Sequence, residues 1–146
     1  MAIHVLVVDD SLTIRAMIEQ VLGNERDIQV VGVASDAKEA HDLIDRFHPD
    51  VVTLDIAMPG MDGMAFLSKI MTEEPCPVLM VSSLTGAGAD ACEEAARRGA
   101  AGCFHKAHIV SQAKAFVKAI RDASRLRKDH PSLFVTPSHA AGAAHG

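Results

Sequence analysis

The hydrophobic residues of this chain follow two patterns in turn, and the alternation repeats five times. Short continuous apolar runs are typical of strands that are covered on both faces. Each run is followed by a segment in which apolar residues recur every three or four positions, which predicts an amphipathic helix. The predicted strands are residues 5–8, 28–33, 51–54, 78–81 and 101–105, and the predicted helices are 12–22, 36–47, 64–73, 89–98 and 110–128.

This alternation predicts the class of the fold. Strands that alternate with helices form a parallel sheet with helices on both faces, because each helix carries the chain back across the sheet. Five such units are too few for an eightfold barrel, so we expect an open, doubly wound α/β sheet. Residues 1–128 would form this single domain. Residues 129–146 lack bulk and periodicity, and we expect them to be a flexible tail.

Polar residues mark several of the predicted helix ends. Ser11 is placed to cap the first helix, and Asp36 and Glu39 have capping-box spacing at the start of the second. His48 and Pro49 follow the second helix, where the residue before a proline rarely stays helical. The helix ends inferred from periodicity and from capping therefore agree.

Polar side chains also follow four of the predicted strands, at the point where each strand ends. They are Asp9 and Asp10, Asp55, Ser82 and Ser83, and Lys106. Because the carboxyl ends of parallel strands share one edge of the sheet, and ligands bind in crevices at that edge, we expect these residues to lie together. The fold would thus collect three carboxylates, two hydroxyls and one ammonium group in one small region.

Three carboxylates so close together favour a bound cation. Two unit charges about 4 Å apart interact by roughly 4 kcal/mol at an effective dielectric constant of about 20. A divalent ion relieves that repulsion, and hard oxygen ligands with little histidine or cysteine nearby favour Mg²⁺. A Mg²⁺ ion with open positions can also hold phosphate oxygens.

A carboxylate beside such an ion can attack phosphorus and form an aspartyl phosphate. Asp55 is the best nucleophile because it stands alone after the middle strand. Asp9 and Asp10 are adjacent, so one can bind the metal directly while the other acts through water. Lys106 would pair with the phosphoryl group as a point charge, and Ser82 would donate a hydrogen bond to it.

The same residues resemble the receiver domain of two-component response regulators, and most closely the receiver of chemotaxis protein-glutamate methylesterases. The resemblance covers residue 3 to about residue 125. It is carried by VVDDS at 7–11, DVVTLDIAMPGMDG at 50–63, PVLMVSSLT at 77–85, and Lys106. The resemblance implies a flavodoxin-like sheet with strand order 2-1-3-4-5 and five helices.

The resemblance also implies a role for each site residue. It makes the chain a phosphorylation-dependent switch of chemotaxis-like signalling, with a phosphohistidine of a sensor kinase or phosphotransfer protein as donor and a downstream protein as target. Asp55 becomes the phosphoacceptor, Ser82 the switch hydroxyl and Lys106 the ion-pair residue. The implied Mg²⁺ ligands are Asp10, Asp55 and the backbone carbonyl of Ala57, with Asp9 assisting through water.

The chain departs from the family pattern at three points. Ala107 stands where the family usually has a cis proline, and a non-proline residue strongly disfavours the cis bond. Cys103 stands where the family often has an aromatic switch residue. No GxSxG nucleophile elbow occurs, so we expect no methylesterase activity and no enzyme activity beyond the phosphotransfer and dephosphorylation of the receiver itself.

Three other interpretations stay open. The chain could be the receiver fragment of a longer chemotaxis methylesterase. A phosphatase of the haloacid-dehalogenase type also uses an aspartate nucleophile, but it needs a second aspartate two positions later, where this chain has Ala57. A flavodoxin-like cofactor binder needs a phosphate-cradling loop after the first strand, where Asp9 and Asp10 would repel phosphate unless a metal intervened.

Charge and composition exclude several classes of function. The chain has 146 residues, a net charge of −5 and 3% aromatic residues, so it lacks the basic surface and stacking residues typical of nucleic-acid binding. No apolar stretch approaches the roughly 20 residues that a membrane helix needs. The first residues contain no basic leader or cleavage site, so we expect no signal peptide and a cytoplasmic location.

Cysteine and histidine positions give no sign of a disulfide framework or of a second metal site. Cys76, Cys92 and Cys103 are widely spaced and odd in number, which favours a reducing compartment. We expect all three to be small buried hydrophobic residues. His105 and His108 have the spacing of metal ligands only on a helix, and we expect them at the surface.

Small residues fill the chain between Gly86 and Gly102. Small side chains bury little area, so we expect the helix at 89–98 to be weakly anchored. This helix and its flanking loops would form a mobile element. Phosphorylation would then shift a surface made of the fourth helix, the fifth strand and the fifth helix.

Overall fold

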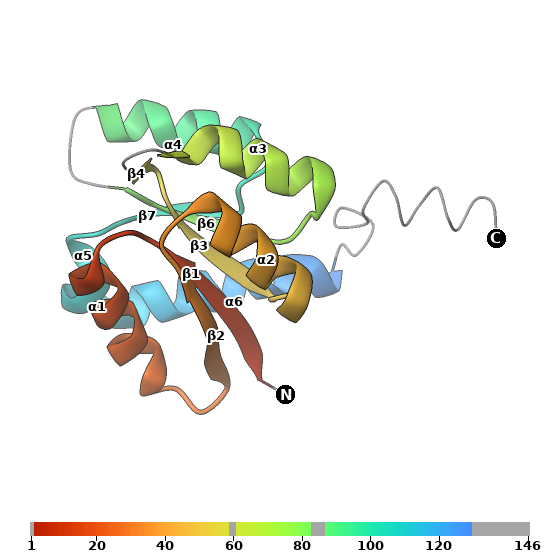
Figure 1. The fold of residues 1–146 in the computed structure, drawn as a ribbon. Helices are drawn as coiled ribbons and strands as arrows, with labels where there is room; N and C mark the ends of the chain where they lie inside the picture. Colours follow the sequence, from red (N-terminus) through yellow and green to blue (C-terminus); the bar gives the residue numbers. More distant parts are fainter. Residues whose placement is uncertain (1, 59–60, 83–86, 130–146) are drawn as a thin grey trace.

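A five-stranded parallel sheet runs through the middle of the molecule, with helices on both of its faces (Figure 1). The computed structural model describes residues 2–58, 61–82 and 87–129. The sheet strands are β1 (Ile3–Val8), β2 (Ile28–Ala34), β3 (Val51–Asp55), β6 (Val78–Ser82) and β7 (Gly102–His105). The helices are α1 (Leu12–Gly23), α2 (Ala37–Phe47), α3 (Gly63–Glu73), α4 (Ala87–Arg97), α5 (His108–Ser111) and α6 (Ala113–Asp129).

The strand order confirms the predicted fold class. The order is β2-β1-β3-β6-β7, which is 2-1-3-4-5 when only the strands of this sheet are counted, and every neighbouring pair is parallel. The order reverses between β1 and β3, so the carboxyl ends of these two strands lie side by side at the switch point where such sheets bind ligands.

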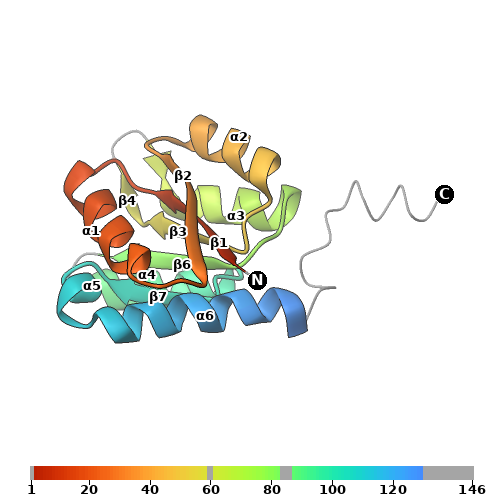
Figure 2. The ribbon, with the colours of Figure 1, turned by 90° about the horizontal axis from the view of Figure 1, so that it is seen from below.

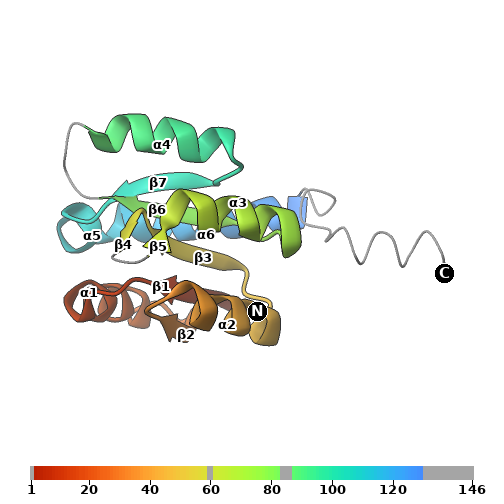
Figure 3. The same ribbon diagram turned by 45° about the horizontal axis from the view of Figure 1, so that its top comes forward.

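The two faces of the sheet bury two hydrophobic clusters. Side chains alternate along each strand, so neighbouring residues belong to opposite faces. One face packs against α2, α3 and α4, and the other packs against α1, α5 and α6, as the views in Figures 2 and 3 show. The central strands are therefore buried on both sides, which explains their continuous apolar runs.

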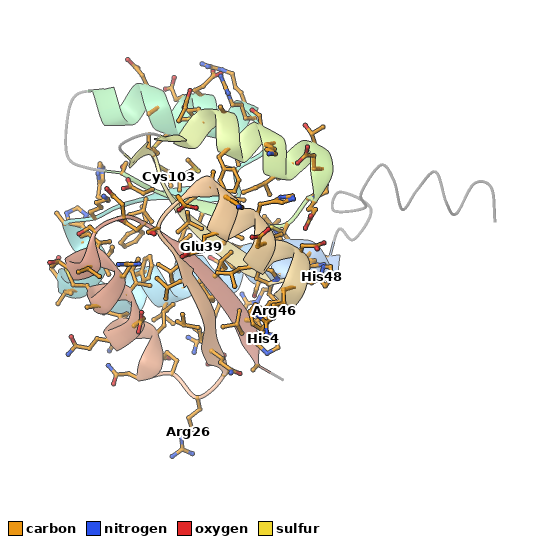
Figure 4. The ribbon with its side chains drawn as sticks, in the orientation of Figure 1. His4, Arg26, Glu39, Arg46, His48 and Cys103 are labelled. Carbon is orange, nitrogen blue, oxygen red and sulfur yellow. A yellow bond between two sulfur atoms is a disulfide. The ribbon has the colours of Figure 1, made fainter. Side chains whose placement is uncertain are left out.

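The helix caps confirm the predicted starts of the first two helices. The Ser11 side chain accepts a hydrogen bond from the backbone N–H of Ile14. Asp36 accepts from the N–H of Glu39 at 2.8 Å, and the Glu39 carboxylate accepts from the N–H of Ser35 at 3.2 Å. Figure 4 shows Glu39 at the start of α2 and His48 at its end.

The last predicted helix is two helices, which corrects the single segment at 110–128. The short α5 ends before Gln112, whose φ of −125° and ψ of 51° interrupt the helix, and α6 begins at Ala113. Ile109 and Phe116 are both fully buried in the same cluster. Residues seven positions apart would also lie on one face of a single continuous helix. The hydrophobic spacing therefore does not reveal the break.

The turn predicted before α3 contains a small antiparallel hairpin, β4 (Ala57–Met58) and β5 (Met61–Asp62). Asp62 then caps α3 by accepting from the N–H groups of Met64 and Ala65. Pro59, Gly60, Ser83 and residues 130–146 of the predicted tail lie outside the described residues, and Asp129, the first residue of that tail, is the last residue of α6. Among the described residues, no helix has both the length and the apolar character needed to cross a membrane.

The cysteines correct the prediction that all three are buried, unbridged residues. Cys92 on α4 and Cys103 on β7 form a disulfide, with 5.8 Å between their Cα atoms. Both are only partly buried, whereas Cys76 is a buried free thiol, as predicted. The two partners come together because α4 packs over β7, a tertiary contact that the widely spaced positions in the sequence do not indicate.

Candidate functional site

Three aspartates gather where β1 and β3 end. Val8 pairs with Leu54 in the sheet, so Asp9 and Asp55, the next residues, emerge beside each other. Asp9 and Asp55 are buried, at 1% and 2% exposure, and Asp10 is exposed. One carboxylate oxygen from each of the three lies within 4.8 Å of the others. The structure thus brings together the three carboxylates that the sequence places at strand ends.

Asp9 is held rigidly, with one oxygen left for another partner. Its Oδ1 accepts a hydrogen bond from the N–H of Ser11 at 2.8 Å, and its own N–H donates to the carbonyl of Ala34 at 3.0 Å. Its Oδ2 is buried and accepts no hydrogen bond among the described residues; it lies 3.6 Å from the Lys106 ammonium. A buried carboxylate oxygen without a hydrogen bond is costly unless a cation completes its environment.

Lys106 brings the opposite charge from the end of β7, two strands away from β3 in the sheet. Its Nζ donates to Asp55 Oδ2 at 2.9 Å, and its backbone N–H donates to the carbonyl of Ser82 at 2.8 Å. Burial lowers the pKa of Lys106, but the hydrogen bond and charge of Asp55, helped by Asp9, outweigh burial and raise that pKa above its usual value. The side chain is therefore an ammonium at neutral pH.

The charges in this cluster do not balance. Three carboxylates face one ammonium group, which leaves an excess of two negative charges when all are ionised. The ligand atoms are hard oxygens from Asp9, Asp10 and Asp55, and one of them, Asp9 Oδ2, is buried without a hydrogen bond. This donor set fits a small divalent cation such as Mg²⁺, which prefers carboxylate oxygens and keeps part of its water shell.

Ser82 lies at the same edge of the sheet, at the end of β6. Val81 pairs with Asp55, so the Ser82 hydroxyl is one residue beyond the strand position beside the central carboxylate. Ser82 is buried at 2% exposure, and its Oγ lies 3.9 Å from Cys103 Sγ. Ser82 and Lys106 are also tied through the backbone, so a shift of one moves the other. Ala57 lies two residues past Asp55, in β4.

Gly63 lies against the backbone at the end of β3, and the polar residues at the strand ends do not reveal this contact. A Cβ atom at Gly63 would lie 2.6 Å from the carbonyl oxygen of Ile56 and 2.7 Å from that of Asp55. Only glycine lets the first turn of α3 pack this closely against the end of β3. The signal in the sequence is a glycine directly after the capping Asp62, where a helix former is expected.

Comparison with known proteins identifies the family. The model of the response regulator receiver domain matches residues 5–121. The chain belongs to the response regulator receiver family. This confirms the resemblance that the strand-end residues indicated, since the receiver match includes Asp9, Asp10, Asp55, Ser82 and Lys106.

Several known proteins resemble this receiver domain. The chain is 53% identical over 103 residues to a protein-glutamate methylesterase/protein-glutamine glutaminase of Rhizobium etli, a match that covers 70% of this chain and 30% of that protein. A Caulobacter vibrioides protein of the same name is 53% identical over 104 residues, covering 71% and 30%. The chain thus matches about 30% of the length of these curated relatives.

A solved structure agrees in fold. The response regulator domain of Thermotoga maritima CheB superimposes with a TM-score of 0.78 at 39% identity, covering 86% of this chain and 98% of that one. The receiver of NtrX from Brucella abortus superimposes with a TM-score of 0.69 at 31% identity, covering 80% and 98%. The similarity to the methylesterase receiver is therefore present in both sequence and structure.

Proposed function

We propose that this receiver domain is a phosphorylation-dependent switch in which Asp55 accepts a phosphoryl group in a Mg²⁺-dependent reaction. The observation that carries the proposal is the position of Asp55: it is buried, pairs with Lys106 at 2.9 Å and lies within 4.8 Å of Asp9 and Asp10. A carboxylate set between an ammonium group and a cation site has what phosphoryl transfer requires, namely orientation and charge neutralisation.

The reaction follows from these side chains. An oxygen of the Asp55 carboxylate forms a bond to phosphorus while the bond to the leaving nitrogen of a phosphohistidine breaks, and the electron pair stays on that nitrogen. Lys106 stabilises the negative charge that moves onto the phosphoryl oxygens. Asp10, Asp55 and the Ala57 carbonyl would hold Mg²⁺, with Asp9 acting through water. The ion, when bound, supplies further charge neutralisation at the phosphoryl oxygens.

The switch would start at Ser82 and Lys106. An aspartyl phosphate adds about 1.5 to 2 negative charges where a carboxylate stood, by analogy with other phosphorylated side chains. Lys106 is already paired with Asp55, and the buried Ser82 hydroxyl would reorient toward the new oxygens. Their shared backbone hydrogen bond transmits this movement to β7, and from there to the surface formed by α4, β7 and α6.

The partners follow from this chemistry and from the relatives. We infer that the donor is a sensor histidine kinase or a phosphotransfer protein, that the output is docking on a protein rather than on nucleic acid or a membrane, and that the domain acts in the cytoplasm. The similarity to protein-glutamate methylesterases favours a role in chemotaxis-like signalling. Residues 1–128 would be the switch and residues 129–146 a tail, with no enzyme activity beyond the receiver's own phosphotransfer.

Labelling with a small phosphodonor tests the proposal. The chain is incubated with acetyl phosphate and Mg²⁺, and intact mass is measured for the wild type, Asp55→Asn and a control, Asp62→Asn. Asparagine also caps helices, so the control keeps the start of α3 while it removes a nearby carboxylate. We expect the wild type and the Asp62→Asn control each to gain one phosphoryl group, and Asp55→Asn to gain none. Equal labelling of Asp55→Asn would overturn the assignment.

A further inference from the structure

The disulfide between Cys92 and Cys103 joins the site to the proposed output surface. Cys103 is on β7, and Cys92 is on α4, the helix packed over that strand. The Cα atoms are 5.8 Å apart, an ordinary separation for a disulfide. Cys103, labelled in Figure 4, packs against the core cluster beneath α2, α3 and α4. Its Sγ also lies 3.9 Å from the buried hydroxyl of Ser82.

Helix α4 has few other strong attachments among the described residues. Ala95 is its one buried side chain there, and an alanine buries little area. Beyond its last residue, Arg98 bonds to the carbonyl of Met64 and the hydroxyl of Ser68 on α3, both at 3.2 Å. These exposed hydrogen bonds hold the end of the helix. The disulfide at Cys92 is thus the one covalent attachment of α4 to the sheet among the described residues.

We propose that Cys92 and Cys103 form a redox site that controls how readily the domain takes up a phosphoryl group. The oxidised pair ties α4 to β7 and opposes the rearrangement of Ser82 and the α4 surface, and the reduced pair releases them. This inference rests on the proposed function of Asp55. It assigns a modification site to two residues whose chemistry the switch reaction itself does not use.

The reaction that opens the bridge is thiol–disulfide exchange with a cellular dithiol or glutathione. A thiolate of the reductant attacks one sulfur of the bridge and forms a mixed disulfide, and a second thiol displaces that intermediate. Two electrons and two protons pass to the chain, which gains the Cys92 and Cys103 thiols, while the reductant becomes a disulfide. Both cysteines are only partly buried, whereas Cys76 is buried and its pKa is raised to about 12 by burial.

The structure also indicates the direction of the effect. The bridge is present while Asp55 pairs with Lys106 as a carboxylate, so the oxidised pair is compatible with that form of the site. A disulfide holds its sulfurs closer than two thiols can lie, so reduction separates them and loosens the contact beside Ser82. In a reducing compartment such bridges are mostly transient and regulatory. Linkage then requires that phosphorylation make the bridge easier to reduce.

The test compares beryllofluoride binding by the two redox forms. The full chain is equilibrated with glutathione disulfide or with dithiothreitol, the bridge is verified by peptide mapping, and binding with Mg²⁺ is measured by ¹⁹F NMR. Wild type and the control Cys76→Ser should bind at least about fivefold more weakly when oxidised, the lower end of usual coupling. Cys92→Ser should bind equally under both conditions, like the reduced wild type.

Hydrogen exchange of α4 provides the second measurement. We expect its amides to exchange faster after reduction in the wild type and to be independent of redox conditions in Cys92→Ser. Equal binding and equal exchange in the two forms of the wild type would overturn the redox site, as would failure of glutathione disulfide to form the bridge. Loss of beryllofluoride binding in both redox forms would instead overturn the role of Asp55, and the exchange data would still decide whether the bridge holds α4.

Discussion

Lys106 Nζ lies 2.9 Å from Asp55 Oδ2, although 51 positions separate these residues in the sequence. The pair joins the end of β7 to the end of β3, two strands that are separated by β6. The same ammonium group is 3.6 Å from Asp9 Oδ2. Lys106 therefore offsets part of the negative charge of Asp55 and Asp9, and a divalent cation bound by the same carboxylates would compete with it electrostatically.

This competition predicts opposite effects of Lys106→Met on metal binding and on phosphorylation. Without the ammonium group the folded chain should lose roughly 1–3 kcal/mol, because two buried carboxylates lose their partner. Mg²⁺ should bind several-fold more tightly, since less positive charge opposes it. Phosphorylation should nevertheless slow by at least about tenfold, because charge on the phosphoryl oxygens is no longer neutralised. Calorimetry with Mg²⁺ and labelling with acetyl phosphate measure the two effects.

Lys118→Met is the matched control for this prediction. Lys118 also forms a lysine–aspartate pair, at 2.7 Å to Asp122, but on the exposed surface of α6. Such pairs contribute about 0.3–0.5 kcal/mol, and this one is remote from the cluster. We expect Mg²⁺ affinity and labelling to stay at wild-type levels. An unchanged Mg²⁺ affinity in Lys106→Met would contradict the idea that the ammonium group and the metal compete.

Gly63→Ala should damage the site without touching any of its charges. The new Cβ would press against the carbonyl oxygens of Asp55 and Ile56 at 2.6–2.7 Å, and backbone atoms cannot turn aside as a flexible side chain can. Either α3 or the end of β3 has to move, which we expect to cost roughly 1–3 kcal/mol, as overpacking does. Movement of β3 displaces Asp55, so phosphorylation should slow as well.

Gly23→Ala provides the comparison. Nothing lies within 4 Å of a Cβ at Gly23, the last residue of α1, and alanine favours helices over glycine. This variant should be as stable as the wild type or slightly more stable, with normal labelling. Urea unfolding of both variants separates the effect of crowding from that of losing a glycine. Equal stability of the two would show that α3 does not pack on β3 as closely as described.

The sequence was sufficient to predict the sheet and to bring Asp9, Asp55 and Lys106 to one edge, for a simple reason. In parallel sheets the strand ends share an edge, so a residue that follows an apolar run is placed by the topology alone. The topology therefore also determines which other strand-end residues lie near it. The prediction of a common site depended on this geometry and not on any single motif.

Other features depend on details of packing that leave no trace in the periodicity. The break at Gln112 keeps Ile109 and Phe116 on one face of the helix, so the apolar pattern is unchanged by it. The Cys92–Cys103 bridge depends on the position of α4 relative to β7. The small residues of that helix give no sign of this position in the sequence. Both features arise from tertiary contacts, and both concern the segment that follows Ser82.

Thr53→Val should stabilise the chain. Thr53 is 1% exposed in the middle of β3, and its Oγ1 has no hydrogen-bond partner among the described residues. Valine has nearly the same shape and favours strands, so the change removes an unsatisfied hydroxyl without opening a cavity. We expect a gain of about 1 kcal/mol in the free energy of unfolding.

Thr72→Val is the control. The Thr72 hydroxyl donates to the carbonyl of Ser68 at 2.8 Å, so its removal should not stabilise the chain. A loss of stability in Thr53→Val would mean that the hydroxyl is satisfied.

With the Cys92–Cys103 bridge formed, the free thiol of Cys76 should lower the free energy of unfolding in alkaline solution. Burial raises the pKa of its thiol from 9.0 to about 12, so the folded chain keeps a proton that the unfolded chain releases. A raised pKa gives stability that is complete below pH 9 and is lost as the pH rises toward 12. The free energy of unfolding should therefore fall by on the order of 1 kcal/mol per pH unit in that window.

Cys76→Ala is the variant that isolates this effect. Its small cavity lowers stability at every pH, but the part of the pH dependence that comes from the Cys76 thiol should vanish. The raised pKa of Lys106 affects both chains equally, so the difference between their slopes isolates Cys76. Parallel pH profiles in urea unfolding would show that the thiol is not protected by burial.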